Sequence, residues 1–331
     1  MILNTKTSNG SYDIVIKRGA LGELNKYLNL DRKVLIVTDS GVPEAYLKTV
    51  AKQCTAPFIF TFPQGEESKS FDTYKQILEK MVQSGFTRSD CVVAVGGGVV
   101  GDMSGFAAAS FMRGVDFYNI PTTVLSQVDS SIGGKVAIDF CGVKNIVGAF
   151  YPPKAVIIDA DTLKTLPDRQ ISNGLCEALK MAATFNEELF RHFEGDNLLD
   201  IDYIITESLK IKRDVVESDE KEQGVRKVLN FGHTIGHAIE SENFGKLYHG
   251  ECVGLGMLCL CSNEAKPRIE SALKKLNLPT KCEIDAEKII EHIAHDKKKS
   301  GDFVSVIWVE KIGSYEIREM DLASLLEVIK K

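Results

Sequence analysis

Short apolar runs alternate with amphipathic stretches over the first half of the chain. The strand-like runs are residues 33–39, 58–62, 91–95, 117–120 and 155–158. Each of the first three runs is followed by a stretch with apolar positions at helical spacing, at residues 43–53, 71–82 and 99–110. Strands that alternate with helices at this spacing predict a parallel sheet covered by helices.

The pattern changes after about residue 160. Helical spacing then dominates, at residues 173–193, 203–216, 234–242 and 286–296, with one β-like run at 303–309. We therefore expect two domains, an α/β Rossmann-like domain with a parallel sheet over 1–160 and a mostly α-helical domain over 161–331.

Composition excludes several function classes. The 331 residues are 44% hydrophobic and carry a net charge of −6, which argues against nucleic acid as the main partner. No apolar run is long enough for a membrane span, and the N-terminus lacks the pattern of a secretory signal. The eight cysteines contain no CxxC pair, so we expect reduced thiols and a cytoplasmic enzyme.

A glycine-rich segment, GGGVVG at residues 96–101, follows a predicted strand and precedes a predicted helix. In that context its GxGxxG pattern favours a dinucleotide, whose pyrophosphate would lie at the helix N-terminus. The alternative is a tight turn that binds nothing. An acidic residue is expected about twenty positions later, but Asp116 and Asp129 are both imperfect candidates.

Three of the six histidines cluster at positions 233, 237 and 249. His233 and His237 share a helix face and suit a metal, while the glutamate of an HExxH protease is absent. A catalytic site with three protein ligands often includes a carboxylate, and Glu177 lies on an apolar helix face where a lone charge is costly. Spacing leaves open whether His237 binds the metal or transfers protons, and whether the histidines are ordinary helix residues.

Cationic and polar residues gather in two further regions. Residues 126–135 and 142–145 are polar and glycine-rich, and we expect them to form loops. Lys212, Arg226 and Asn230 lead into His233, and cations beside a metal suit a substrate that carries phosphate and carboxylate. The alternative is a solvated, salt-bridged helix face.

Taken together, these segments resemble the 3-dehydroquinate synthase family. The similar stretches cover most of the chain and are residues 96–139, 142–153, 166–180, 219–240, 249–257 and 295–298 (HDKK). The resemblance implies a shikimate-pathway enzyme with an NAD domain and a helical metal- and substrate-binding domain.

The resemblance also implies a role for each matching residue. It assigns Glu177, His233 and His249 to a divalent metal, zinc or alternatively cobalt, and it gives His237 to substrate binding and proton handling. The other implied substrate residues are Arg113, Asp129, Lys135, Lys144, Asn145, Lys180, Lys212, Glu222, Arg226, Asn230 and Lys297, which adjoins Lys298. Those with catalytic roles beside His237 are Lys135, Asn145, Lys180 and Glu222. The implied NAD residues are Asp39, Glu66, Lys69, Gly97, Gly98, Asp102, Thr122, Thr123, Lys144, Thr165 and Leu166.

The implied reaction converts 3-deoxy-D-arabino-heptulosonate 7-phosphate into 3-dehydroquinate and phosphate. It proceeds through transient oxidation by NAD, β-elimination of phosphate, re-reduction and an intramolecular aldol step. Arg113 matches a residue that reaches the substrate of a neighbouring subunit, which implies a homodimer. The alternatives are another sugar phosphate cyclase, a metal-dependent polyol dehydrogenase and a non-catalytic NAD-binding regulator.

Overall fold

The computed structural model describes residues 1–8, 10–195, 200–243, 245–283, 285–296 and 303–330. The chain forms two compact units, Met1–Leu166 and Pro167–Lys331. The sequence placed the domain boundary near residue 160, which falls in the 3₁₀ helix η6 (Ala160–Thr165).

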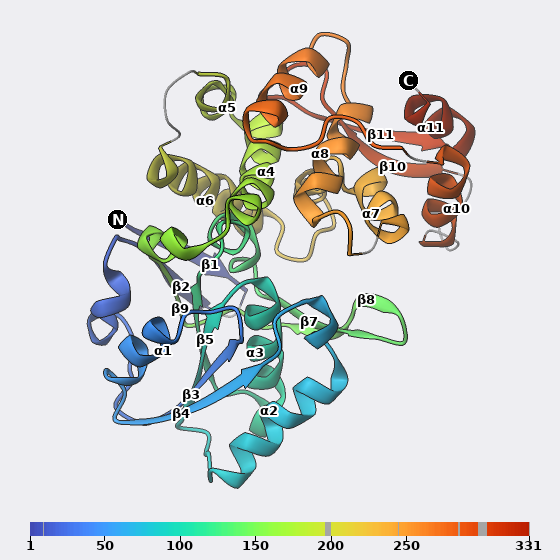
Figure 1. Cartoon of the computed structure of the whole chain (residues 1–331). Helices are drawn as coiled ribbons and strands as arrows, with labels where there is room; N and C mark the ends of the chain where they lie inside the picture. The colour runs from blue at the N-terminus through green and yellow to red at the C-terminus, as the bar shows by residue number, and fades with distance from the viewer. Residues whose placement is uncertain (9, 196–199, 244, 284, 297–302, 331) are drawn as a thin grey trace. The chain divides into compact units, whose positions relative to one another are not determined.

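Unit 1 is built on a seven-stranded sheet with the order β1-β2-β9-β6-β5-β3-β4 (Figure 1). The strands are β1 (Ile2–Thr7), β2 (Gly10–Ile16), β3 (Lys33–Asp39), β4 (Ala56–Phe62), β5 (Cys91–Gly96), β6 (Asp116–Pro121) and β9 (Ala155–Ile158). Only the β1–β2 pair is antiparallel within this sheet. The predicted α/β class with a parallel sheet is confirmed, whereas the β1–β2 hairpin was not identified from the sequence.

Helices cover both faces of this sheet. Alternate residues of β3 and β5 point to opposite faces, so each of these strands contributes side chains to two hydrophobic cores. One core lies against α1 (Glu44–Ala51), and the other lies against α2 (Phe71–Gln83) and α3 (Gly98–Ser110). All three helices lie within a residue or two of the expected ranges.

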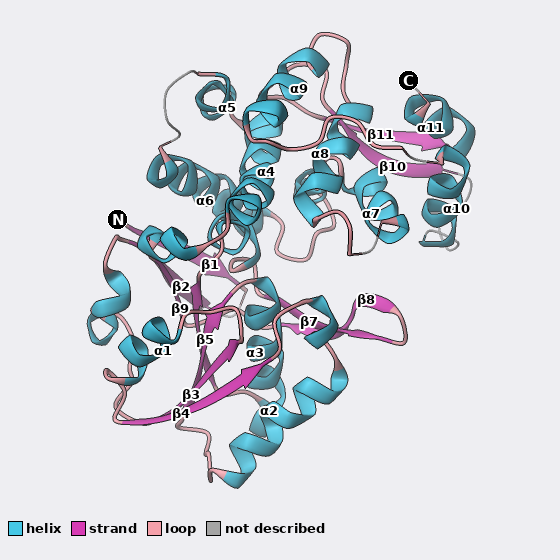
Figure 2. Cartoon of the chain, in the orientation of Figure 1, coloured by secondary structure: helices cyan, strands magenta, loops and turns pink. Residues whose placement is uncertain are grey.

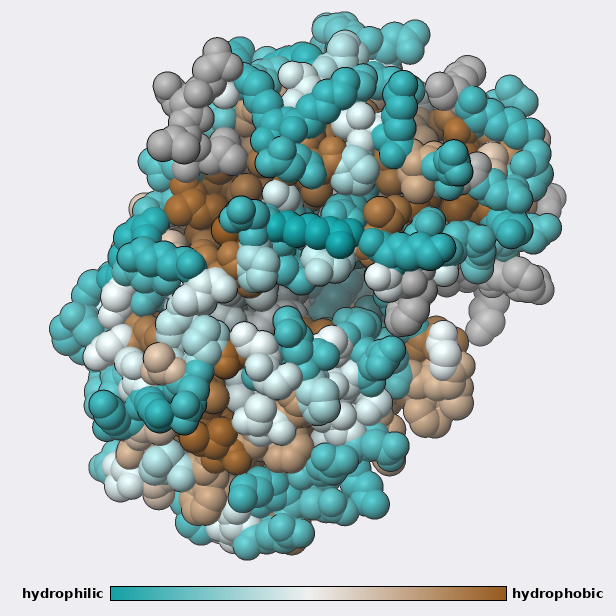
Figure 3. Space-filling view, in the orientation of Figure 1, coloured by the Kyte–Doolittle hydropathy of each residue, from teal (hydrophilic) through white to brown (hydrophobic). Residues whose placement is uncertain are grey.

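A second sheet in unit 1 corrects one prediction. The sequence predicts loops at residues 126–135 and 142–145. Residues 126–130 instead form the helical turn η5 (Ser126–Ser130), and residues 135 and 143–145 belong to the hairpin of β7 (Lys135–Phe140) and β8 (Val143–Phe150). Residues 131–134 and 142 lie in turns and loops, as predicted. Val136 and Ile138 are buried at alternate positions of β7, while the polar Lys135 and Asp139 lie on its other face, so polar residues here are compatible with a strand. Apolar side chains are exposed on this hairpin (Figure 3), including Ile146 at 60% exposure.

Unit 2 is mostly helical, as predicted (Figure 2). Its helices are α4 (Asp168–Phe185), α5 (Glu187–Glu194), α6 (Ile201–Ser218), α7 (His233–Glu242), α8 (His249–Cys259), α9 (Lys266–Lys275), α10 (Ala286–Asp296) and α11 (Leu322–Ile329). A hairpin joins β10 (Phe303–Trp308) to β11 (Glu316–Asp321). The continuous helix expected over 173–193 is interrupted at Asn186, whose side chain caps α5 by accepting a hydrogen bond from Leu189 N.

Helices α7 and α8 approach each other closely because glycines line their contact. A Cβ atom on Gly256 would lie 2.0 Å from the carbonyl oxygen of Gly232, and one on Gly236 would lie 3.0 Å from that of Cys252. Since backbone atoms cannot yield as a flexible side chain does, only glycine fits at Gly256. This contact sets the spacing of the two helices that carry the three clustered histidines.

Candidate functional site

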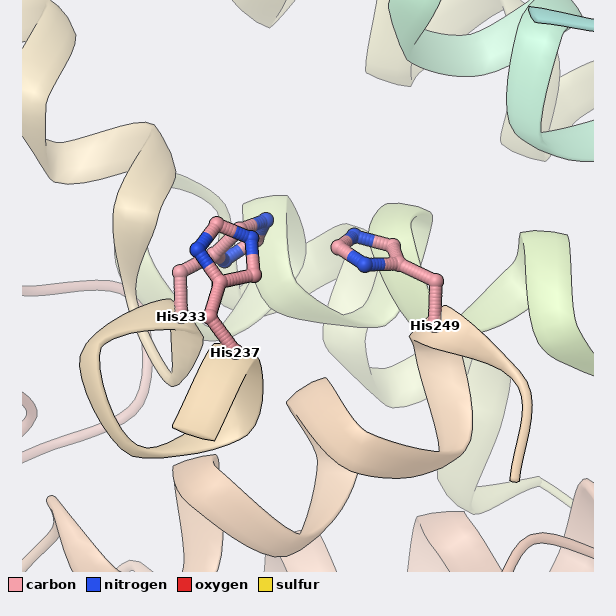
Figure 4. Close-up of side chains that lie close together, drawn as sticks. All are labelled: His233, His237 and His249. Carbon is pink, nitrogen blue, oxygen red and sulfur yellow. The ribbon is translucent and has the colours of Figure 1, made fainter. Parts of the chain in front are cut away.

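The three histidines converge in unit 2. His233 and His237 come from the first turns of α7, and His249 begins α8 (Figure 4). Each offers a ring nitrogen, and these nitrogens lie within 4.8 Å of one another. The ring centroids are separated by 5.1–5.6 Å. His233 and His237 are one helical turn apart on α7, and the fold brings His249 next to them from the other side of the α7–α8 loop.

Glu177 of α4 completes this cluster. Its Oε1 lies 3.8 Å from His233 Nε2 and 3.5 Å from His249 Nε2, and it has no hydrogen-bond partner within the described part of the chain. Its Oε2 accepts a hydrogen bond from the buried amino group of Lys180, one turn along the helix. A buried carboxylate oxygen and two imidazole nitrogens are together a set of donors that suits a divalent metal such as zinc.

The electrostatics of the cluster keep Glu177 ionised. Burial alone would raise the pKa of Glu177, but Lys180 and then His233 hold it well below its usual range. Burial and the charge of Lys180 hold the pKa of His233 well below its usual value, so this ring is neutral. Burial would also lower the pKa of His249, but the carboxylates of Glu177 and Glu240 outweigh it and raise that pKa to about 9.

Each of two rings has a second contact on the side away from Glu177. His233 Nδ1 donates to the carbonyl oxygen of Phe231 at 3.2 Å, and His249 Nδ1 donates to Glu240 Oε2 at 3.0 Å. In the neutral form of each ring, a proton on Nδ1 leaves the lone pair on Nε2, the nitrogen on the side of Glu177. Glu240 was missed in the sequence, although it shares the helix face of His233 and His237 at helical spacing.

The expected anion-binding residues of unit 2 lie on α6 and on the 3₁₀ helix η7 (Val225–Asn230). Lys212 and Arg226 are 7% and 2% exposed, so the alternative of a solvated helix face is wrong for these two cations. Arg226 donates to the carbonyl oxygen of Glu220 at 2.5 Å, and Asn230 Nδ2 donates to Glu222 Oε1 at 2.6 Å. Lys297 and Lys298 lie outside the described residues.

The expected cofactor residues of unit 1 gather at the carboxyl ends of adjacent parallel strands. Asp39 ends β3, Gly97 and Gly98 follow β5, and Thr122 and Thr123 follow β6. Ligands of open α/β sheets bind at this edge. Asp116 is excluded from it, because it begins β6, pairs in register with Cys91 and binds Arg32 at 2.7 Å.

The glycine loop packs closely against neighbouring residues. A Cβ on Gly96 would lie 2.5 Å from Val100, so part of the glycine pattern has a packing reason. A Cβ on Gly98 would lie 3.1 Å from Ser130 Oγ, a buried hydroxyl without a hydrogen-bond partner among the described residues. A polar atom in this state, beside the N-terminus of α3, fits a bound phosphate group.

Lys69 connects expected cofactor and substrate residues. Its amino group lies 2.6 Å from Asp102 Oδ2 and 3.9 Å from Glu66 Oε1, and it donates to Asn145 Oδ1 on β8. Burial raises the pKa of Asp102 to about 6, although Lys69 opposes that change. Asp139 Oδ1 accepts from Asn145 N at 2.7 Å, so Asn145 is held from two sides.

The remaining predicted residues are placed as follows. Thr165 Oγ1 lies 3.0 Å from the hydroxyl of Tyr46 and precedes Leu166 at the end of η6. Asp129 lies in η5, and Lys135 and Lys144 lie on β7 and β8. Hydrogen bonds and short polar contacts thus bring together Glu66, Lys69, Asp102 and Asn145 in unit 1, and Glu177, Lys180, His233 and His249 in unit 2.

Backbone strain coincides with three predicted site residues. Arg113, Asn145 and Glu222 have φ angles of 69°, 54° and 59°, in the left-handed region that non-glycine residues rarely adopt. Such strain is concentrated at ligand-binding and catalytic positions in proteins. No local sequence pattern reveals this left-handed backbone conformation, because none of the three residues is a glycine, the residue that usually marks it.

The chain matches two family domains in succession, 3-dehydroquinate synthase N-terminal over residues 59–173 and 3-dehydroquinate synthase C-terminal over residues 174–299. It is 41% identical to the 3-dehydroquinate synthase of Campylobacter concisus, over 99% of this chain and 98% of the relative.

Two solved structures share the fold. The structure of 2-deoxy-scyllo-inosose synthase with carbaglucose-6-phosphate, NAD⁺ and Co²⁺ is 25% identical, with a TM-score of 0.88 and coverage of 100% and 99% of the two chains. ValA, a 2-epi-5-epi-valiolone synthase from Streptomyces hygroscopicus with NAD⁺ and Zn²⁺ bound, is 24% identical, with a TM-score of 0.89 and coverage of 98% of each chain.

Proposed function

This chain belongs to the 3-dehydroquinate synthase family, and we propose that it converts 3-deoxy-D-arabino-heptulosonate 7-phosphate into 3-dehydroquinate and phosphate. The observation that carries the proposal is the near-complete alignment with a relative of that name, at 41% identity. This membership speaks against a polyol dehydrogenase, a cyclase of different substrate and a non-catalytic NAD-binding regulator.

We propose Glu177, His233 and His249 as the ligands of one divalent metal, zinc or cobalt. The buried Glu177 Oε1, which faces both ring nitrogens without a hydrogen-bond partner among the described residues, supports this choice. A metal bound there would supply Lewis-acid polarisation of a substrate oxygen. Lys180 keeps Glu177 anionic, and we propose it as a catalytic and substrate-binding residue on the family resemblance.

We propose the third histidine of the cluster, His237, for substrate binding and proton transfer, as the family resemblance implies. Its ring is exposed, unlike those of His233 and His249, which are half-buried. A general base needs access to the proton that it removes, and an accessible imidazole beside a metal has that access. We propose Lys135, Asn145 and Glu222 as further catalytic residues.

Buried cations would hold the two anionic groups of the substrate. Lys212 and Arg226 are largely removed from water, where charge-assisted hydrogen bonds to phosphate or carboxylate are stronger. Asp129, Lys144, Asn230 and Lys297 are proposed substrate residues on the family resemblance.

NAD would accept a hydride from the substrate and return it, so no reduced cofactor would accumulate. Gly97 and Gly98 would leave backbone N–H groups open to the pyrophosphate, and Asp39 lies at the adjacent strand end, where a ribose is expected. The other proposed cofactor residues are Glu66, Lys69, Asp102, Thr122, Thr123, Lys144, Thr165 and Leu166.

We further propose a homodimer in which Arg113 reaches the phosphate of the neighbouring subunit's substrate. Arg113 is exposed, and its left-handed backbone follows that of Met112, with a φ of 49°. Two consecutive strained residues on a short turn fit a side chain that must be presented outward.

We propose the cytoplasm as the location. All eight cysteines are free thiols, as a reducing compartment requires. No helix within the described ranges combines the length and apolar character needed to cross a membrane.

The deciding experiment incubates purified protein with the heptulosonate phosphate, zinc and substoichiometric NAD. We expect stoichiometric release of phosphate and 3-dehydroquinate, with no net NADH. A heptulose phosphate and a hexose phosphate without the carboxylate are the matched controls. Net NADH formation, or faster turnover of a control substrate, would reject the proposal.

A further inference from the structure

The His249 ring lies between two carboxylates from different helices. Its Nε2 lies 3.5 Å from Glu177 Oε1 on α4, and its Nδ1 donates to Glu240 Oε2 on α7 at 3.0 Å. Glu240 is only 16% exposed, so water screens this contact weakly. The ring nitrogen that does not face Glu177 therefore has a fixed, charged hydrogen-bond partner.

We infer that Glu240 is a positioning residue for the metal centre, acting through His249 rather than touching metal or substrate. The inference rests on the metal site in the proposed function. A carboxylate that accepts the second ring N–H of a metal-bound histidine fixes its tautomer and orientation and strengthens the other nitrogen as a donor.

The geometry of α7 explains why this residue is available. His233, His237 and Glu240 follow one another at intervals of four and three residues, which places all three on one face of the helix. A single helix thus presents a proposed ligand, a proposed proton-transfer residue and the support for a ligand on α8. His233 receives the corresponding support from the neutral carbonyl of Phe231.

A second glutamate of α7 also contacts a histidine, and this pair provides a control. Glu242 Oε1 lies 2.6 Å from His292 Nε2 of α10, and both side chains are partly exposed. His292 does not belong to the cluster of His233, His237 and His249. If glutamate–histidine pairs on α7 merely stabilised the fold, the two pairs would behave alike toward metal.

The test compares the wild-type chain with Glu240→Ala, Glu240→Gln and Glu242→Gln. Each protein is stripped of metal, and its affinities for Zn²⁺ and Co²⁺ are measured by chelator competition, together with the visible absorption of the Co²⁺ form. We expect about 10–100-fold weaker binding in Glu240→Ala, as for other outer-sphere carboxylates, and a changed Co²⁺ spectrum.

Glu240→Gln should lie between Glu240→Ala and wild type, because the amide oxygen still accepts the hydrogen bond without the charge. It also keeps the test usable if the alanine variant unfolds, as thermal unfolding of the metal-free proteins would reveal. Glu242→Gln should bind both metals as wild type does.

Wild-type affinity and spectrum in both Glu240 variants would overturn the inference, as would an equal loss in Glu242→Gln. If the wild-type chain itself binds neither metal, the proposed metal centre is wrong and the role of Glu240 is rejected with it. The two failures are therefore distinguishable.

Discussion

Lys180 donates a hydrogen bond to Glu177 across one turn of α4, and both side chains are only 1% exposed. A buried ion pair contributes little net stability, but removal of one partner leaves the other charge buried and uncompensated. The pair thus keeps the carboxylate of Glu177, a proposed metal ligand, ionised in the core.

Lys180→Met should destabilise the metal-free protein by about 3–5 kcal/mol, since Glu177 loses its main compensating charge. The double variant Glu177→Gln/Lys180→Met should be less destabilised, because neither buried charge remains. Denaturant unfolding of wild type, both single variants and the double variant measures the coupling. Additive effects would show that the pair does not act as a unit.

His233→Ala should abolish metal binding and turnover. The loss of affinity should exceed the roughly 10–100-fold that is typical of outer-sphere changes. Isothermal titration with Zn²⁺ and the phosphate-release assay provide the measurements, with His292→Ala of α10 as the control. A variant at position 233 that stays active without metal would refute the ligand assignment.

Asp102 should make stability depend on pH. Its folded pKa of about 6 lies above the usual value of 3.8, so the folded state binds the proton more tightly. Its contribution is fully present below about pH 4 and is lost as pH rises through about 6. The neutral Asp102→Asn should therefore gain stability relative to wild type between pH 4.5 and 6.5, by about 2 kcal/mol at most.

Unfolding free energies of both Asp102 proteins, measured by denaturant titration at several pH values, test this expectation. The difference should level off above about pH 6.5. A difference independent of pH would mean that Asp102 titrates normally despite its burial.

Gly256→Ala should separate α7 from α8, because its Cβ would lie 2.0 Å from Gly232 O. We expect a stability loss of about 1–3 kcal/mol and weaker Zn²⁺ binding, since His233 lies on α7 and His249 lies on α8. Gly22→Ala is the matched control, because a Cβ there meets nothing within 4 Å. Wild-type metal affinity in Gly256→Ala would show that the helix spacing does not set the site.

Arg113→Ala and His233→Ala should complement each other if Arg113 acts across a two-fold dimer. In a mixed dimer, one site would combine an intact metal centre with an intact arginine, so an equal mixture after subunit exchange should recover about a quarter of wild-type activity. Each variant alone should be nearly inactive. No recovery despite verified exchange would place Arg113 in its own subunit's site.

The sequence is sufficient to predict the alternation of strands and helices, because burial imposes periods of 2 and 3.6 on the hydrophobic positions. It also determined the candidate metal residues, since the four-residue spacing of His233 and His237 places them on one helix face. The glycine loop was recognisable from its position between a strand and a helix.

Contacts between residues that are far apart in the sequence become visible in the folded chain. The contact of Glu240 with His249 depends on the packing of α7 against α8. The burial of α4 leaves one oxygen of Glu177 without a hydrogen-bond partner among the residues that the structure describes. Asp39 precedes the glycine loop in the chain, whereas the sequence pattern points downstream, where Asp116 and Asp129 are imperfect candidates. The place of Asp116 at the start of β6 excludes it. Strand order and helix packing arise from contacts between distant segments, which local periodicity does not encode.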